Sequence, residues 1–243
     1  MQYIKVLATD STNSSLKKLL RENPLMKNTC LITENQTKGK GQRGNSWHSK
    51  PYKNLTFSVL LKNINLNPVE HFKLNALVSL SLFDFLQNKI QIPTISIKWP
   101  NDILAGNKKI CGILIENILR GKKINHSIIG IGLNVNQTDF ENLPQATSLK
   151  TITKKDFDLD FLAKNFVEFL EEKIYLGLKK PLSIILKDYQ NHLFRKDKIS
   201  CFEFPDKTQK QGIIKGISTS GKLIISFDKN TAEFDLKEIK LLY

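Results

Sequence analysis

The stretch of sequence that decides the fold is ISIKWPNDILAGNKKICGILIENILRGKKINHSIIGIGLNV, residues 95–135. Three runs in it, 95–99, 110–117 and 127–135, are rich in β-branched residues, which are typical of strands. Turn-forming residues separate these runs, namely Asn101-Asp102, Ala105-Gly106-Asn107 and Gly121-Lys122. The stretch therefore predicts three neighbouring antiparallel strands of one sheet.

The residues before this stretch predict further strands and two helices. Strands are expected at 3–7, 30–33 and 55–61. A helix is expected to begin at Asp10 or Ser11 and to stop at Asn23-Pro24. A second helix begins at Pro68, and its apolar residues up to Leu86 are dense enough to predict that it is buried.

The residues after the stretch divide into a helical part and a β part. Apolar residues recur at helical spacing from Asp158, and Pro181 begins a further helix, so the main domain is expected to be α+β, with a mixed or antiparallel sheet packed with helices. Short strands divided by turns follow Phe194, at 199–204, 212–217, 223–227 and 231–236. They predict a small β barrel and two domains, 1–192 and 193–243, the first of which we expect to fold without the second.

Length and composition indicate a globular protein. The chain has 243 residues, 40% hydrophobic and 25% charged, which excludes disordered and fibrous classes. It has neither an apolar run of about 20 residues nor a basic start leading into an apolar segment, so we expect no membrane partner and a cytoplasmic location. The three cysteines are odd in number and far apart, which argues against disulfides, a zinc knuckle and CxxC redox chemistry.

The charge favours a polyanionic or acidic partner. Lys and Arg number 37 against 23 Asp and Glu, a formal net charge of +14. A basic nucleic-acid-binding protein is therefore one hypothesis. However, the lysines are spread over the whole chain, as a general coding bias would also produce. One local concentration of basic residues lies in the glycine-bearing stretch 38–53.

That stretch contains the first candidate site, TKGKGQRGNSW at residues 37–47. Spaced glycines let backbone amides wrap an anion, Lys40 and Arg43 add positive charge, and the indole of Trp47 can stack on a base. No Gly-Lys-Ser/Thr opens a helix, so this is not a Walker A loop. The loop suits an anionic, ring-bearing ligand, and a flexible basic surface loop is the alternative.

Two further patterns carry candidate chemistry. Pro100 ends a strand and displays Asn101 and Asp102, while Lys109 enters an apolar strand where its ammonium would act on a carboxylate or phosphate. The glycines of GIGLNVN, residues 130–136, allow a ligand to approach a strand closely. An ordinary turn, a solvated strand edge and a β-bulge are the respective alternatives.

Taken together and in order, these motifs resemble the biotin protein ligases. The residues that carry the resemblance are Ser11-Thr12-Asn13, Gln36, GKGQRG at 39–44 with Trp47, KWPND at 98–102, Lys109 with Gly112-Ile113-Leu114, and Gly132-Leu133-Asn134. The resemblance implies a class II aminoacyl-tRNA synthetase-like catalytic domain at 1–192 and an SH3-like domain at 193–243. Because the Ser-Thr-Asn motif begins ten residues in, we expect the form without a DNA-binding domain and no sequence-specific DNA binding.

The resemblance also implies a reaction. Biotin and MgATP would form biotinyl-5′-AMP and pyrophosphate, and a lysine of a biotin carboxyl carrier protein, from acetyl-CoA carboxylase or a related carboxylase, would then take the biotin. A lipoate-protein ligase or octanoyltransferase is the nearest alternative, and the KWPND strand and the GxGxxG-Trp loop favour biotin. The sheet edge near Ile128 offers a surface for a homodimer.

The resemblance assigns roles to individual residues. The catalytic residues would be Lys40, Arg43, Asp102 and Lys109. The biotin contacts would be Ser11, Thr12, Asn13, Gln36, Gly39, Lys40, Lys109, Gly112 and Gly132. The ATP contacts would be Gly41, Gln42, Arg43, Trp47, Asn101, Lys109 and Asn134, with Asn101 also touching Mg²⁺.

Two residues depart from the family pattern. Lys40 replaces an arginine, which keeps the charge but gives up bidentate geometry. Gln42 stands where family loops commonly carry arginine, which removes a cation next to Arg43. We therefore expect weaker retention of the adenylate.

Overall fold

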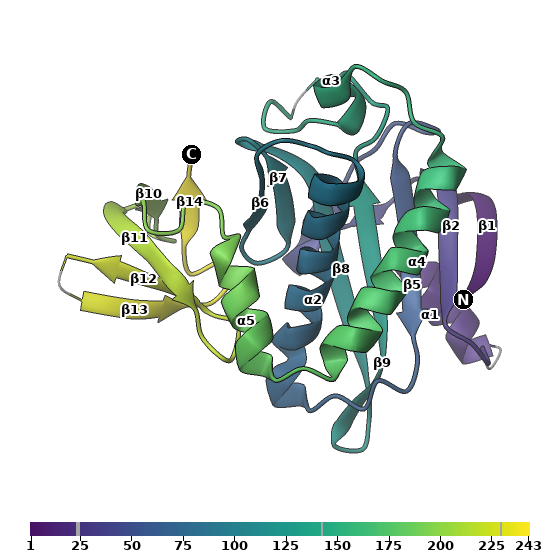
Figure 1. Ribbon diagram of the computed structural model, residues 1–243, viewed down its shortest axis with the longest axis horizontal. Coiled ribbons are helices and arrows are strands. Elements are labelled where there is room, and N and C mark those ends of the chain that lie inside the picture. Colours follow the sequence, from purple (N-terminus) through teal and green to yellow (C-terminus); the bar gives the residue numbers. More distant parts are fainter. Residues whose placement is uncertain (23–24, 142, 229) are drawn as a thin grey trace.

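The computed structural model describes residues 1–22, 25–141, 143–228 and 230–243, and of Arg43 the backbone alone. Seven strands form the main sheet in the order β1-β2-β5-β9-β8-β7-β6 (Figure 1). Their bounds are β1 Gln2–Thr9, β2 Thr29–Gln36, β5 Leu55–Leu61, β6 Ile95–Lys98, β7 Asp102–Ala105, β8 Lys108–Arg120 and β9 Lys123–Leu133. The pair β1 and β2 is parallel and the other neighbouring pairs are antiparallel, so the predicted mixed sheet is confirmed.

The stretch 95–135 forms four strands rather than the predicted three. Asp102–Ala105, expected to be part of a turn, forms β7 between β6 and β8. Ile103 pairs with Ile97 on one side and with Cys111 on the other, and Ile103 and Leu104 are both fully buried. Four residues are too few to show a strand period, and burial of adjacent residues removes the alternation that would reveal one.

Helices cover both faces of the main sheet (Figure 1). Their bounds are α1 Thr12–Glu22, α2 His71–Asp84, α3 Leu149–Thr153, α4 Leu159–Leu178 and α5 Leu182–Asn191, with short turns η2 Pro68–Glu70 and η3 Phe85–Lys89 beside α2. On α1, Leu16 packs with Leu31, Leu60 and Ile128 in a small cluster of its own. The neighbours of these strand residues face the larger cluster under α2 and α4, because successive residues of a strand point to opposite faces.

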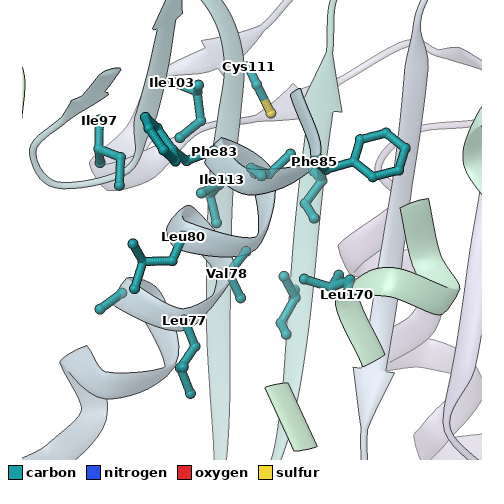
Figure 2. Close-up of a cluster of buried hydrophobic side chains, with 14 of the residues drawn as sticks. Leu77, Val78, Leu80, Phe83, Phe85, Ile97, Ile103, Cys111, Ile113 and Leu170 are labelled. Carbon is teal, nitrogen blue, oxygen red and sulfur yellow. The ribbon is translucent and has the colours of Figure 1, made fainter. Parts of the chain in front are cut away.

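The larger cluster confirms that the helix after Pro68 is buried. Side chains all around α2 are buried, and Figure 2 shows Leu77, Leu80 and Phe83 in one cluster with the strand residues Ile97, Ile103 and Ile113. Asn67 caps the η2 turn by accepting a hydrogen bond from the Val69 amide, so the sequence signal at Pro68 marks a short 3₁₀ turn before the α-helix. The predicted stop of α1 at Asn23-Pro24 lies outside the described residues.

The glycine loop predicted at residues 37–47 contains regular structure. Strand β2 continues to Gln36, β3 (Gly39–Lys40) pairs antiparallel with β4 (Ser46–Trp47), and η1 (Gln42–Gly44) joins them. Two-residue strands cannot show a period in the sequence. The glycine motif therefore lies on a small hairpin.

The predicted sheet edge near Ile128 is wrong. Ile128 lies on β9, which has β5 on one side and β8 on the other, and the residue is fully buried. The outer strands of the main sheet are β1 and β6. The homodimer stays a prediction, but the region near Ile128 no longer supports it.

The C-terminal segment forms a second sheet of five strands in the order β13-β12-β11-β10-β14. The strands are β10 Ile199–Glu203, β11 Gln209–Ile217, β12 Leu223–Phe227, β13 Asn230–Phe234 and β14 Lys240–Leu242, of which β14 was not predicted. This sheet contacts the main body closely. The Trp99 indole donates to the Gly221 carbonyl at 2.8 Å, and the Gln190 side chain accepts from the Ile217 amide at 3.0 Å.

One apolar cluster runs from the main sheet into the five-stranded sheet. It contains Phe72 of α2 and Tyr189 of α5 together with Phe202, Ile214 and Ile225. The two sheets thus share a core, which argues against independent folding of residues 1–192. No helix in the described ranges is both long and apolar enough to span a membrane.

Candidate active site

A cavity of about 540 Å³ lies between the main sheet and the five-stranded sheet, and it contains most of the predicted site. Residues from the start of α1, the β3–β4 hairpin, the turn between β6 and β7, and the glycine-bearing parts of β8 and β9 line it. The predicted residues among them are Ser11, Thr12, Asn13, Gln36, Lys40, Gly41, Gln42, Trp47, Asn101, Asp102, Lys109, Gly112 and Gly132. Residues separated by more than a hundred positions thus meet in one place.

Three of the predicted site residues are not among the described residues that line the cavity. Among the described side chains, Asn134 does not line the cavity, and its amide donates to the Thr147 carbonyl at 3.0 Å. Gly39 lies just behind the lining, where its lack of a side chain lets Gln36 and the Trp47 carbonyl approach it. The side chain of Arg43 lies outside the part of the chain that the structure describes, so its role stays a prediction.

A buried polar network forms one end of the cavity. Gln36 Oε1 accepts from the Thr12 amide at 2.9 Å, and Ser58 Oγ lies 2.7 Å from Thr12 Oγ1 and 2.6 Å from Asn13 Oδ1. Asn13 also donates to Glu116 Oε2 at 2.9 Å. All of these groups except Gln36 and Glu116 are buried, so each hydrogen bond fixes a polar atom that would otherwise be costly to bury. This end of the cavity therefore presents polar groups whose positions are fixed.

The hairpin is fastened to the start of α1. The Lys38 amide donates to the Asp10 carbonyl at 2.8 Å, and Lys40 Nζ donates to Ser14 Oγ at 2.9 Å. The Thr37 hydroxyl donates to the Asp10 carboxylate at 2.8 Å, and this bond, followed by that from Lys38, lowers the pKa of Asp10 below its ordinary value. The glycine loop therefore stays beside the polar network.

Two paired glycines form the floor of the cavity. Gly112 of β8 lies opposite Gly132 of β9, and the Trp47 indole rests on both. A Cβ at Gly132 would lie 2.3 Å from Cε2 of that indole, so any larger residue would displace it. The Trp47 indole nitrogen is buried, and it has no hydrogen-bond partner among the described residues. A ligand acceptor would satisfy it.

A lysine–carboxylate pair lies over this floor. Lys109 Nζ is 2.7 Å from Asp102 Oδ1 and 5.3 Å from the centroid of the Trp47 ring. Asn101 holds the turn in place, since its side-chain amide donates to the Ile113 carbonyl at 2.6 Å and its own carbonyl accepts from the Ile113 amide at 3.0 Å. Lys109 is 34% exposed and faces the cavity, so it is not a solvated lysine at a sheet edge.

Two buried groups that carry no charge lie next to the Lys109–Asp102 pair. Cys111 is fully buried, and burial raises the pKa of its thiol far above the ordinary value. Burial likewise raises the pKa of the Tyr189 phenol, whose hydroxyl donates to the Pro100 carbonyl at 3.1 Å. Both groups stay neutral near pH 7 and add no charge beside the Lys109–Asp102 pair.

The sequence did not reveal the part of the cavity lining that comes from the five-stranded sheet. These residues include Glu203, Phe204, Pro205, Lys207, Leu236, Lys237, Ile239 and Lys240. No motif marks them, because they reach the cavity only through the tertiary packing of that sheet. Ser58 and Glu116 were also missed, although Ser58 is a buried hydroxyl inside the apolar run Leu55–Leu61.

The sequence pattern of this site is that of a known family. The model of the biotin/lipoate A/B protein ligase family matches residues 5–134, which is more than half of the chain. The chain belongs to this family. The matched range contains the polar network, the hairpin, the glycine floor and the Lys109–Asp102 pair, whereas the five-stranded sheet lies beyond it.

Two relatives show which members of the biotin/lipoate ligase family this chain is similar to. A biotin–[acetyl-CoA-carboxylase] ligase of Mycobacterium tuberculosis is 28% identical over 229 residues, which cover 93% of this chain and 84% of that protein. The bifunctional ligase/repressor BirA of Bacillus subtilis is 34% identical over 144 residues, covering 57% of this chain and 43% of that protein. The chain thus spans less than half the length of that second relative.

A solved structure of the family has the same overall fold. The biotin protein ligase from Aquifex aeolicus in complex with biotin and ATP superposes with a TM-score of 0.81 and 28% sequence identity, over 99% of this chain and 98% of that one. The similarity therefore includes the five-stranded sheet as well as the family-matched range.

Proposed function

We propose that this chain is an ATP-dependent ligase that attaches biotin to a lysine of a biotin carboxyl carrier protein through biotinyl-5′-AMP. The observation that carries the proposal is one cavity that joins a buried polar network, a glycine floor under Trp47 and the Lys109–Asp102 pair. The similarity to a biotin–[acetyl-CoA-carboxylase] ligase and to a biotin protein ligase that binds biotin and ATP supports it.

In the first half-reaction the biotin carboxylate attacks the α-phosphorus of ATP and pyrophosphate leaves. The polar network around Thr12 and Gln36 would hold the biotin ring, which points the carboxylate toward Lys109. Two anions repel each other, so a cation must lie between them, and Lys109 Nζ is positioned to bridge carboxylate and α-phosphate. Lys40, hydrogen-bonded to Ser14, would support the same charge from the hairpin.

Magnesium would enter as part of the substrate MgATP. Among the described residues, no group of three or more His, Cys, Asp and Glu side chains could hold a metal ion. The Asn101 amide nitrogen is already used by the Ile113 carbonyl, and Asn101 lines the cavity, so its side-chain oxygen would be available as a hard ligand. Asn101 would hold the ion together with the phosphates of ATP, and the ion would offset part of their negative charge.

In the second half-reaction the carrier lysine attacks the acyl carbon of biotinyl-5′-AMP and AMP leaves. The amine must lose a proton, and the Asp102 carboxylate, 2.7 Å from Lys109, is positioned to orient the incoming ammonium or accept that proton. Lys109 then stabilises the negative charge that develops on the departing phosphate. One lysine thus serves both steps.

The domain assignment completes the proposal. Residues 1–192 would form a class II aminoacyl-tRNA synthetase-like catalytic domain, and residues 193–243 an SH3-like domain. The separate seven-stranded and five-stranded sheets support this division, and the shared cavity makes both parts necessary for the full site.

One experiment tests the function. The protein is mixed with MgATP, a biotin carboxyl carrier domain, and either biotin, lipoate or octanoate, and the carrier is weighed by mass spectrometry. We expect the mass of one biotinyl group, and none after the carrier lysine is replaced by arginine. Modification by lipoate or octanoate alone would favour the lipoate branch of the family. A salt-sensitive shift of DNA with no carrier modification would favour a nucleic-acid binder.

The polar network yields a first prediction. Ser58→Ala should raise the KM for biotin about tenfold, because the hydroxyl that fixes Thr12 and Asn13 is lost, and should change the KM for ATP less than about twofold. Ser127→Ala is the matched control, since this buried serine of β9 donates to Asn117 outside the cavity. Steady-state kinetics of carrier biotinylation measures both. A similar biotin KM for the two variants would contradict the role of Ser58.

Gln42 yields a second prediction. It lines the cavity without supplying a charge, so the adenylate should leak and acylate nearby lysines of other proteins. Gln42→Arg should lower the biotin that appears on a bystander protein by about threefold or more, through an added charge-assisted hydrogen bond to the phosphate. Gln211→Arg, on the exposed face of β11, controls for the added charge. Unchanged bystander labelling in Gln42→Arg would show that this position does not govern retention.

A further inference from the structure

The cavity has two ends with different chemistry. At one end, the polar network comes from α1, β2 and β5, which lie on one side of β8 in the strand order. At the other end, beyond β7 and β6, the lining comes from the five-stranded sheet, which Figure 1 shows on the opposite side from β1 and β2. Lys109 on β8 and the Asn101-Asp102 turn stand between the two ends.

The end at the five-stranded sheet is positively charged. Lys207, Lys237 and Lys240 line it, against one acidic residue, Glu203. Glu203 is only 18% exposed and lies 3.3 Å from Lys207 Nζ and 3.9 Å from Lys240 Nζ. One carboxylate shared by two ammonium groups keeps both near the cavity and leaves the cluster with net positive charge. Inside a concave site such a cluster attracts anions more strongly than on a flat surface.

The direction in which pyrophosphate leaves in the first half-reaction indicates the end of the cavity at the five-stranded sheet. In phosphoryl-transfer chemistry the attacking and leaving oxygens lie roughly in line on opposite sides of the phosphorus. If the carboxylate arrives from the polar network and the α-phosphate rests at Lys109, the leaving pyrophosphate must project toward the five-stranded sheet. We infer that Lys207, Lys237 and Lys240 form a subsite for the β- and γ-phosphates of ATP and for the pyrophosphate product.

This inference rests on the proposed function and adds residues outside the family-matched range. The charge balance of the site favours such a subsite. MgATP retains about two negative charges, and Gln42 supplies none of the positive charge that an arginine would add to the hairpin. Lysine suits the task, because its ammonium is a point charge with rotatable donors and can follow a group that changes position as it leaves.

The test is the variant Lys207→Gln/Lys237→Gln/Lys240→Gln, compared with the native protein. We expect the KM for ATP and the inhibition constant for pyrophosphate both to rise about tenfold or more, because three positive charges that line the phosphate end of the cavity are lost together. The KM for biotin should change less than about twofold. Transfer to the carrier from synthetic biotinyl-5′-AMP should also change less than about twofold, because that step no longer involves pyrophosphate.

A matched variant controls for net charge. Lys198→Gln/Lys215→Gln/Lys222→Gln removes the same charge from the same region, at positions that do not line the cavity. It should leave all four constants within about twofold. If the two triple variants behave alike, the effect is general electrostatics and the subsite is overturned.

Two further outcomes overturn the inference. One is an unchanged ATP KM together with unchanged pyrophosphate inhibition. The other is a raised carrier KM with synthetic biotinyl-5′-AMP and unchanged ATP constants, which would make this surface a docking site for an acidic carrier. If the triple variant unfolds, Lys207→Gln and Lys240→Gln, whose side chains are 80% and 71% exposed, are tested singly. Each should raise both constants about threefold or more. A native protein that fails to biotinylate a carrier refutes the proposed function instead.

Discussion

Replacing Lys109 with alanine is expected to lower the rate of adenylate formation about 100-fold or more while leaving the fold intact. Two effects act together. The variant loses the ammonium that would bridge carboxylate and phosphate, and it leaves the Asp102 carboxylate, 2.7 Å from that ammonium, uncompensated in a cavity that must accept anions. Biotin-dependent release of pyrophosphate measures the rate. Near-normal release would contradict the assignment of Lys109.

The neighbouring lysine provides the control for this prediction. Lys108→Ala removes an exposed ammonium from the same strand, outside the cavity lining, and should leave the rate within about twofold. The double variant Lys109→Ala/Asp102→Asn separates the two effects, because it removes the uncompensated carboxylate as well. A partial recovery of adenylate formation relative to Lys109→Ala would assign part of the loss to repulsion by Asp102. Equal melting temperatures would show that the fold is intact.

The elements that the sequence predicted well are those with a long, consistent pattern. The β-branched runs predicted β8 and β9, and the dense apolar run after Pro68 predicted the buried helix α2. The short elements β3, β4, β7 and β14 went unrecognised. Each has two to four residues, and pairing with a neighbouring strand, rather than local preference, makes them strands.

The residues of the candidate site also fall into two groups, those that the sequence predicted and those that it did not. Residues such as Ser11, Lys109 and Gly132 belong to motifs in which the residue type already suggests a chemistry, and the fold brings them together around one cavity. Glu116 and Lys240 belong to no motif. Their positions follow from which strand pairs with which and from how the five-stranded sheet packs, and a single sequence carries no local signal of either.

Deleting residues 195–243 is expected to abolish cooperative unfolding of the remaining chain, contrary to the expectation from sequence. Phe72 would lose its contact with Gly221, the Trp99 indole its acceptor, and Phe194 its edge-to-face partner Tyr243. Uncovering each large apolar side chain costs about 1.5–3 kcal/mol, whereas a whole domain is stable by only about 5–15 kcal/mol. Thermal unfolding followed by circular dichroism should show a broad, early transition in place of a sharp one.

Two glycine variants isolate this interface within the full chain. Gly221 and Gly121 both have positive φ, +87° and +61°, so alanine at either position carries a backbone penalty of about 1–2 kcal/mol. Only at Gly221 would the added Cβ meet a neighbour, lying 2.3 Å from Phe72 Cδ2, and overpacking adds about 1–3 kcal/mol. Since 1 kcal/mol shifts the Tm of a chain of this size by about 2–4 °C, Gly221→Ala should melt several degrees below Gly121→Ala. Equal Tm values for these two variants, together with a sharp transition in the truncated chain, would mean that residues 1–192 fold independently after all.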